Sequence, residues 1–320
     1  MLILGHDHVL AALGPEDCAE AMAEVLAAHA RGQALMPLRS VVRFEGAAGF
    51  MGTMPAWRGA PDPVFSLKAL CIMPGNPARG LDSHQGTGTL FDGSTGVPTA
   101  ILDASALTAV RTAAVSAVAT RVLAREDARV LAILGAGVQG RAHLAALRYV
   151  RSFGEIRVFA PNTAHARAMA GDAATASASA EEAVRGADVV VTATTSSEPV
   201  LRREWLAAGA HVNAVGASVP SARELDMDTL LDSALFCDSR ESLRSEAGEY
   251  RLALERGAIA GDDHVRASLG EVLAGMADGR RGDDELTVFR SLGLAVEDLA
   301  AALRAVAEAR RLGLGVEVTL

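Results

Sequence analysis

Three glycines in one short stretch have the spacing that binds a dinucleotide phosphate. Gly135, Gly137 and Gly140 lie directly after the apolar run "VLAIL" and directly before a helix-forming run. In this context the first glycine makes a tight turn, the second lets the backbone approach a pyrophosphate, and the third lets helix and strand pack closely. The N-terminus of the helix then faces the anionic group. The stretch therefore predicts a nicotinamide dinucleotide site rather than a glycine-rich turn without a ligand.

The residues after the next strand leave the choice between NAD and NADP open. An acidic residue at the end of "EIRVFA" would bind the ribose of NAD, and a basic residue there would favour NADP. The sequence instead has Asn162 and Thr163. Either side chain could contact a ribose hydroxyl or a 2′-phosphate. The absence of a repelling carboxylate favours NADP slightly.

Two charged residues stand alone in apolar segments. Arg111 occurs in "LTAVRTAA", where it is either a solvated helix position or a clamp for a carboxylate, whose geometry matches a planar guanidinium. Lys68 is the only charge in "VFSLKALCI". A lone lysine in a strand usually marks a solvent-facing or edge position. Partial burial, however, would lower its pKa and suit it to proton transfer, so both interpretations stay open.

Ser218 follows the apolar run "AHVNAVG", which places it at the carboxyl edge of a predicted parallel sheet. Ligands gather at that edge in doubly wound folds. A serine hydroxyl cannot serve unaided as a general base near neutral pH, but it can hydrogen-bond a substrate nitrogen or a water. His84 and Gln85 in "SHQGTG" either make structural hydrogen bonds in a loop or line the mouth of a pocket.

Composition argues against several classes of function. The 30 basic and 39 acidic residues give a net charge of −9, and no basic run points to nucleic acid. No His-x-x-x-His or His-Glu-x-x-His pattern predicts a metal site. Cys18, Cys71 and Cys237 are widely spaced and indicate neither disulfides nor a thiolate zinc site. With no signal peptide and no window of about 18 apolar residues, we expect a cytoplasmic protein without a membrane span.

The elements that must position these residues change character near Ser105. Before it, a helix from Pro15 to about Arg31 and short strand-like pieces are separated by glycine and proline turns. This pattern predicts an α+β layer with antiparallel pairing. An alanine-rich run then predicts a long helix from Ser105.

Further along the chain, strands alternate with helices. The expected strands are "ARVLAILG", "EIRVFA", "ADVVVTATT", "GAHVNAVG" and "SALFCD". Alternation of this kind implies right-handed crossovers and a parallel sheet covered on both faces, so it predicts a Rossmann-type doubly wound domain. After it, segment 291–313 predicts one amphipathic helix that packs back on the N-terminal part. We therefore expect a dinucleotide-binding domain over 121–291 and a discontinuous α+β domain over 1–120 and 292–320.

Several longer segments share their residues with one family. They are "SLKAL", "SHQGTGTLFDGSTG", "LTAVRTAAVSAVAT", "ILGAGVQGRAH", "GADVVVTATT", "GAHVNAVGASVPSARELD" and "TVFRSLGLAVEDLA". In combination, and over nearly the whole chain, they resemble the ornithine cyclodeaminase/mu-crystallin family, most closely its mu-crystallin-type ketimine reductases. The resemblance implies a homodimer whose discontinuous domain supplies the substrate pocket and the dimer interface. It also implies hydride chemistry on small amino or imino acids.

The resemblance also implies roles for residues at matching positions. Arg111 and Arg39 match arginines that bind the substrate carboxylate, and Lys68 matches a pocket lysine that would orient the substrate and handle a proton. Ser218 stands where ornithine-cyclising members carry an aspartate, which favours reduction of a preformed C=N bond over cyclodeamination. The predicted catalytic set is Lys68, Arg39, Arg111 and Ser218. The predicted cofactor-contacting set is Thr112, Gly135, Gly137, Val138, Gln139, Gly140, Asn162, Thr163, Thr194, Gly216, Ala217, Leu292 and Gly293.

These assignments predict NAD(P)H-dependent reduction of an imine that carries an α-carboxylate, such as 1-pyrroline-2-carboxylate or 1-piperideine-2-carboxylate, to the cyclic amino acid. Arg39 and Arg111 would hold the carboxylate so that the imine carbon meets the nicotinamide, which carries the hydride. The alternatives are an amino-acid dehydrogenase of the alanine dehydrogenase type and an ornithine cyclodeaminase. A further alternative is an NADP-dependent protein that only binds a small carboxylate ligand.

Overall fold

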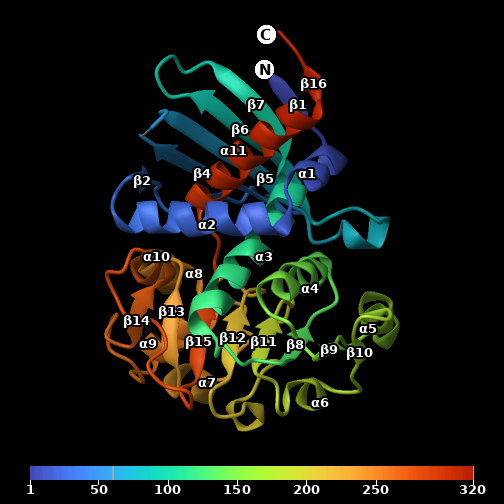
Figure 1. Ribbon diagram of the computed structural model, residues 1–320, viewed down its shortest axis with the longest axis vertical. Coiled ribbons are helices and arrows are strands. Elements are labelled where there is room, and N and C mark those ends of the chain that lie inside the picture. The colour runs from blue at the N-terminus through green and yellow to red at the C-terminus, as the bar shows by residue number, and fades with distance from the viewer. Residues whose placement is uncertain (60, 320) are drawn as a thin grey trace. The chain divides into compact units, whose positions relative to one another are not determined.

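The computed structural model describes residues 1–59 and 61–319, which form two compact units (Figure 1). Unit 1 comprises Met1–Arg111 and Gly293–Leu320, so both ends of the chain contribute to it, and unit 2 comprises Thr112–Leu292. The sequence-based boundaries lay instead at 120/121 and 291/292. No turn marks the first junction, because the single helix α3 (Ala104–Leu123) runs through it. Leu320, the end of the expected first domain, lies outside the described residues.

Unit 1 contains an eight-stranded mixed sheet in the order β16-β1-β7-β6-β5-β4-β2, with β3 paired to β4. Its longest strands pair antiparallel, whereas β1 and β7 are parallel. The strands are β1 (Leu2–Leu4), β2 (Ala34–Leu35), β3 (Ser40–Val42), β4 (Phe50–Arg58), β5 (Val64–Ile72), β6 (His84–Asp92), β7 (Pro98–Asp103) and β16 (Val316–Glu317).

Helices cover one face of this sheet (Figure 1). Helix α11 (Ala295–Leu312) packs on β4, β5 and β6 and against α2 (Pro15–Ala30), while α1 (His6–Ala12) packs on α11. The helix predicted over 291–313 begins only at Ala295. Gly293 has φ +81°, a left-handed conformation that is incompatible with a continuing right-handed helix.

The register of the sheet determines where Lys68 points. On β5, Lys68 lies opposite Met54 of β4 and Gly88 of β6. Successive side chains of a strand face opposite sides, and Lys68 is only 2% exposed, beneath the covering helices. The solvent-facing interpretation of this lysine is therefore wrong.

Unit 2 contains an eight-stranded sheet in the order β10-β9-β8-β11-β12-β15-β13-β14, in which every pair is parallel. The doubly wound prediction is confirmed, although β15 was not expected as a strand. The strands are β8 (Val130–Leu134), β9 (Glu155–Phe159), β10 (Thr175–Ala176), β11 (Val189–Thr192), β12 (His211–Ala214), β13 (Ala234–Cys237), β14 (Val265–Ser268) and β15 (Thr287–Arg290).

Two buried cores lie on the two faces of this sheet. Alternate residues such as Leu131 and Ile133 pack with α3, α4 and α5, and the intervening Ala132 and Leu134 pack with α6 to α9. This alternation is what a strand buried on both faces requires. The remaining helices are α4 (Val138–Val150), α5 (Thr163–Ala170), α6 (Ala180–Val184), α7 (Met227–Leu231), α8 (Arg240–Glu246), α9 (Gly248–Glu255), α10 (Leu269–Leu273) and the short η1 (Pro77–Arg79) and η2 (Arg203–Trp205).

Helix α3 is long and apolar enough to cross a membrane by length and composition, with a mean hydropathy of 1.3. However, 78% of that stretch is buried inside the protein. A helix that is apolar on all sides and buried is typical of a protein core as well. The arginine that α3 carries at position 111 is buried with it.

Candidate functional site

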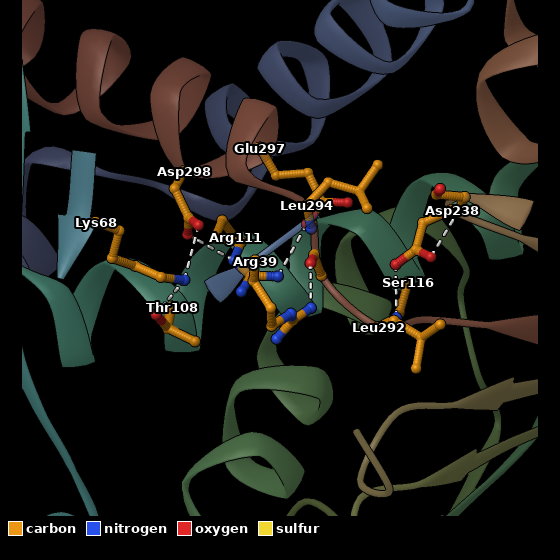
Figure 2. A network of polar contacts seen from close by, with 12 residues as sticks. Arg39, Lys68, Thr108, Arg111, Ser116, Asp238, Leu292, Leu294, Glu297 and Asp298 are labelled. Atoms are coloured by element: carbon orange, nitrogen blue, oxygen red, sulfur yellow. Dashed lines mark hydrogen bonds and ion pairs between the residues drawn. The ribbon is translucent and has the colours of Figure 1, made fainter. Parts of the chain in front are cut away.

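Charged side chains from four parts of unit 1 meet in its interior (Figure 2). The Lys68 Nζ atom lies 2.7 Å from Oδ2 of Asp298. Arg111 donates from Nε to the other oxygen of Asp298, at 3.0 Å, and from Nη1 to Oε2 of Glu297, at 2.9 Å. Arg39 is close enough for its charge to act on Lys68. We call these five residues the charge cluster.

Regular elements hold the members of the charge cluster in place. Lys68 is in the middle of β5, and Arg111 is on α3. Glu297 and Asp298 occupy the first turn of α11, where acidic side chains are favoured by the helix dipole. Glu297 also accepts a hydrogen bond from the backbone N–H of Leu294, at 3.1 Å. The carboxylates are thus fixed at the start of the helix that covers the sheet.

Arg39 reaches the cluster from the segment that precedes β3. Its Nη2 donates to the carbonyl oxygen of Gly293 at 2.7 Å. The guanidinium of Arg111 lies against the same glycine, because a Cβ atom added to Gly293 would be 2.5 Å from Arg111 Nη1. Both arginines therefore contact Gly293, and its missing side chain makes room for Arg111.

The charge cluster is buried and positively charged. Lys68, Arg111, Glu297 and Asp298 are each no more than 4% exposed, and Arg39 is half-buried. Three cations face two carboxylates when Lys68 is protonated, which leaves a formal charge of +1. Buried charges are stable only when they are paired. One added carboxylate would neutralise the group, and arginine binds carboxylates well.

Lys68 can change its protonation state near neutral pH. Burial lowers the pKa of its ammonium group from 10.5 to about 8, while the charge of Asp298 opposes this shift and that of Arg111 adds to it. Burial acts in the opposite direction on Asp298, but the charges of Lys68 and Arg111 keep the pKa of this carboxyl below its usual 3.8. At neutral pH the pair is therefore an ammonium and a carboxylate.

The amino-acid composition also points to this site, through a single lysine that no sequence motif singles out by its number. The chain has 30 basic residues, and Lys68 is the only one that is not arginine. Arginine stays protonated at every physiological pH, whereas a buried lysine can give up a proton. A single amine in a chain that otherwise uses arginine points to chemistry that arginine cannot perform.

In unit 2, the glycine-rich loop has the shape that a dinucleotide needs. Gly135 has φ +119°, and a Cβ atom there would collide with the carbonyl of Ala193. A Cβ on Gly140 would collide with the carbonyl of Gly135, whereas Gly137 has open space around it. Gly137 is also the N-cap of α4 and brings no capping side chain. The first N–H groups of α4 thus fit a pyrophosphate.

Asn162, in the connection from β9 to α5, has a structural role in addition to any contact with a ligand. Its Oδ1 accepts from the backbone N–H groups of Ala164, at 3.0 Å, and His165, at 3.4 Å, and so caps α5. With Oδ1 used in this way, the side-chain amide can offer hydrogen-bond donors to a ribose or a phosphate. Thr163 is the first residue of α5.

The buried carboxylate of Glu224, which no sequence motif indicated, joins the ends of two strands of unit 2. Glu224 accepts from Thr192 Oγ1 at 2.9 Å, from the N–H and Oγ1 of Thr194 at 2.7 Å each, and from the N–H of Gly216 at 2.6 Å. Burial raises the pKa of Glu224, against the effect of these donors. Glu224 therefore fixes the residues after β11 and β12, which include two of the predicted cofactor contacts.

Arg290 fixes the loop that leads to Ser218. It is 1% exposed, pairs with Glu249 at 2.5 Å, and donates to the carbonyls of Ala214, at 2.8 Å, and Ala217. Ser218 itself is half-buried. Arg290 was not singled out in the sequence because its strand, β15, was not recognised.

The predicted site residues thus fall into two groups. Unit 1 brings Arg39, Lys68, Arg111 and Gly293 together. The rest lie in unit 2: Thr112, Gly135, Gly137, Val138, Gln139, Gly140, Asn162, Thr163, Thr194, Gly216, Ala217, Ser218 and Leu292. Leu292 donates its N–H to Asp238 at 2.5 Å (Figure 2).

The histidine and glutamine at the start of β6 make local hydrogen bonds. His84 Nδ1 is 3.1 Å from Ser83 Oγ, and Gln85 Nε2 donates to the carbonyl of Asp82 at 3.0 Å. Burial lowers the pKa of His84, so it is neutral at pH 7. Within residues 1–59 and 61–319, no group of three or more His, Cys, Asp or Glu side chains could hold a metal ion.

Known proteins share both units with this chain. Ketimine reductase mu-crystallin of Mus musculus is 42% identical over 275 residues, which cover 85% of this chain and 84% of the relative. The structure of Thermococcus litoralis Delta(1)-pyrroline-2-carboxylate reductase, with NADH and L-proline, has a TM-score of 0.93, 33% identity and coverage of 99% and 100% of the two chains. An archaeal alanine dehydrogenase dimer with bound NAD has a TM-score of 0.93 and 34% identity, over 100% of this chain and 99% of the other.

The similarity extends through the charge cluster and the glycine-rich loop alike. A sequence model of the ornithine cyclodeaminase/mu-crystallin family matches residues 3–311, a range that includes every predicted site residue. The family that the sequence motifs resemble is therefore confirmed over nearly the full chain. This protein, with a charge cluster in one unit and a dinucleotide loop in the other, belongs to the ornithine cyclodeaminase/mu-crystallin family.

Proposed function

We propose that this protein is an NAD(P)H-dependent reductase of ketimines that carry an α-carboxylate, such as 1-pyrroline-2-carboxylate or 1-piperideine-2-carboxylate. One observation carries the proposal. Unit 1 buries a cluster with an excess positive charge and a single titratable amine, in a chain whose other unit has a dinucleotide loop. The names of the mouse and Thermococcus relatives support the same reaction class.

Each part of the reaction has a candidate residue. Arg39 and Arg111 hold the substrate carboxylate and fix the position of the C=N bond. Lys68 gives a proton to the imine nitrogen, because a protonated imine accepts a hydride more readily. NAD(P)H, when bound, supplies the hydride. Glycine-loop N–H groups in unit 2 bind the pyrophosphate, and Ser218 hydrogen-bonds the substrate nitrogen or a water.

The proposed activity is tested by following NADPH and NADH oxidation with each cyclic imine. We expect turnover that saturates with imine and needs no added ammonia. If neither dinucleotide is oxidised faster than in the absence of protein, the proposed reduction is wrong. Pyruvate with ammonia tests the alanine dehydrogenase alternative that the archaeal relative suggests. Ammonia release from ornithine tests cyclodeamination, which is disfavoured because Ser218 lacks a carboxylate.

A non-catalytic function remains the alternative from a different class. A carboxylate ligand that binds tightly without dinucleotide oxidation, and equally well to Lys68→Ala, would identify a binding protein. The buried ammonium of Lys68 favours catalysis, since a carboxylate ligand would be held as well by arginine alone.

We also propose that the protein is a homodimer that pairs through the uncovered face of the unit 1 sheet. That face carries Met51, Trp57, Phe65, Leu67 and Ile101, on the side opposite Lys68. Phe65 is 47% exposed and Met51 is 42% exposed. Contiguous apolar surface of this kind usually marks an interface, and the archaeal relative is a dimer. Light scattering should give twice the chain mass, and Phe65→Asp should give a monomer.

We place the protein in the cytoplasm. Its cysteines Cys18, Cys71 and Cys237 are free, which suits a reducing compartment. Fractionation of cells that express the natural gene would test this location.

A further inference from the structure

The carboxylate of Asp298 contacts two different cations at the same time. Oδ2 lies 2.7 Å from Lys68 Nζ, and Oδ1 accepts from Arg111 Nε at 3.0 Å. Lys68 Nζ also donates a hydrogen bond to the Thr108 hydroxyl, at the longer distance of 3.4 Å. All these groups project from regular elements, namely β5, α3 and α11 (Figure 2). Asp298 thus connects the amine to the arginine that we assign to the substrate carboxylate.

We propose that Asp298 is a positioning residue of the active site, which keeps Lys68 in its ammonium form and fixes it beside Arg111 before the substrate binds. Asp298 would not itself touch the substrate. The existence of the pair does not depend on the proposed function. Only the use of the proton, for reduction of an imine, rests on that function.

The charges around Lys68 show why this amine needs a carboxylate. Arg111 on α3 and Arg39 before β3 both repel the ammonium, and burial disfavours it further. His84 on β6 is neutral at pH 7 and gives no support. Asp298 on α11 attracts the ammonium by its charge, at a distance of 2.7 Å between Nζ and Oδ2. Without Asp298, an amine buried between two arginines would lose its proton below its present pKa of about 8.

Glu297 is not equivalent to Asp298, although the two are adjacent. Its Oε2 receives hydrogen bonds from Arg111 and from the backbone of Leu294. It therefore neutralises the arginine and caps the helix, whereas the carboxylate 2.7 Å from the Lys68 ammonium is that of Asp298. This difference makes Glu297 a matched control for Asp298.

In each turnover, the proton that Asp298 stabilises on Lys68 would pass to the substrate. One N–H bond of the Lys68 ammonium breaks, and an N–H bond forms at the imine nitrogen. The imine carbon accepts a hydride from NAD(P)H, so the C=N bond becomes a CH–NH bond. Lys68 is left as a neutral amine beside Asp298 and regains a proton from water before the next cycle.

The test uses the fact that the chain has one lysine. Protein labelled with 13C- and 15N-lysine gives a single side-chain signal, whose titration is followed by NMR without substrate or cofactor. We expect a midpoint near pH 8 for the natural sequence and a fall of about one pH unit or more for Asp298→Asn. Glu297→Gln should shift the midpoint by less than half as much. The pH above which imine reduction declines should fall in Asp298→Asn by the same amount as the Lys68 midpoint.

Three outcomes would overturn the inference. They are an Asp298→Asn midpoint that is unchanged or raised, a Glu297→Gln shift as large as that of Asp298→Asn, and a natural-sequence midpoint below pH 7. The last can be measured even if Asp298→Asn does not fold, because a neutral Lys68 at pH 7 would mean that Asp298 does not keep the proton in place. Since the titration needs no imine, its result stays separate from failure of the reductase assay.

Discussion

Gly293 lies against the guanidinium of Arg111, and a single added methyl group would displace it. A Cβ at Gly293 would be 2.5 Å from Nη1 and 2.8 Å from Nη2 of Arg111. Gly293, which the family resemblance predicts as a cofactor contact, is thus closely approached in unit 1 by an arginine of the same chain. The carbonyl of Gly293 also receives a hydrogen bond from Arg39.

We predict that Gly293→Ala weakens binding of the imine carboxylate. The substitution forces Arg111 away from its position and strains a backbone with φ +81°. We expect KM for the imine to rise about tenfold, which corresponds to about 1.4 kcal/mol, as measured by steady-state kinetics at saturating dinucleotide.

Gly313→Ala is the matched control for this change. Gly313 has φ +68°, ends α11 in the same unit, and has no atom near the position of a Cβ. Both variants should lose about 1–2 kcal/mol of stability from the left-handed backbone. If both raise KM equally, the effect comes from strain and not from Arg111.

Replacing the only lysine by arginine should abolish proton transfer but keep the positive charge. Lys68→Arg can still pair with Asp298, yet arginine does not release a proton near neutral pH. We expect kcat/KM to fall by about 10²-fold or more. Binding of NADPH, measured by its fluorescence, should change less than twofold. A variant with natural activity would show that Lys68 only orients the substrate.

The pH dependence of the natural enzyme should report the same group. The ammonium of Lys68 is the active form, and burial lowers its pKa to about 8. The rate should therefore be constant below that pH and decline as pH rises through about 8. Saturating imine and dinucleotide separate this effect from binding. A rate that instead increases through pH 8 would make the neutral amine the active form.

The dinucleotide loop and the parallel sheet of unit 2 could be predicted because their signals are local. Strand, glycines and helix follow one another from Val130 to Val150, and a Cβ on Gly140 would collide with the carbonyl of Gly135 in the same stretch. Strand β15 was missed for the opposite reason. It has four residues and inserts between β12 and β13, which precede it in the chain, so only long-range pairing identifies it.

The charge cluster could be predicted only in part. Its cations stood out because each is isolated in an apolar run, and the family resemblance gave them roles. The carboxylates of Glu297 and Asp298 did not stand out, because two acidic residues in the first turn of a helix are usually explained by the helix dipole. Asp298 became recognisable only when the fold placed α11 over β5. The boundary between the two units at Arg111 could not be predicted either, because α3 continues through it.

We predict that Glu224 is necessary for cofactor binding, because it holds Thr194 and Gly216 in place. Glu224→Gln keeps the shape of the side chain, but its NH2 group replaces an oxygen that accepts two of the four donors, one of them a backbone N–H. We expect a stability loss of about 1–3 kcal/mol, measured by urea unfolding, and weaker binding of NADPH.

The control for Glu224 is another glutamate of unit 2. Glu198 pairs with Arg223 at 2.7 Å, and its side chain is 74% exposed. Glu198→Gln should cost at most about 1 kcal/mol, because exposed ion pairs contribute little. Equal losses in the two variants would contradict a special role for the buried carboxylate.

Asn162 provides a test of the choice between NADP and NAD. Aspartate caps a helix as well as asparagine does, so Asn162→Asp should preserve α5. The new charge would hydrogen-bond the 2′-hydroxyl of NADH and repel the 2′-phosphate of NADPH. We expect the ratio of NADPH to NADH affinity, measured by fluorescence titration, to fall about tenfold or more. Equal ratios before and after the change would mean that the 2′ position of the bound ribose does not lie near residue 162.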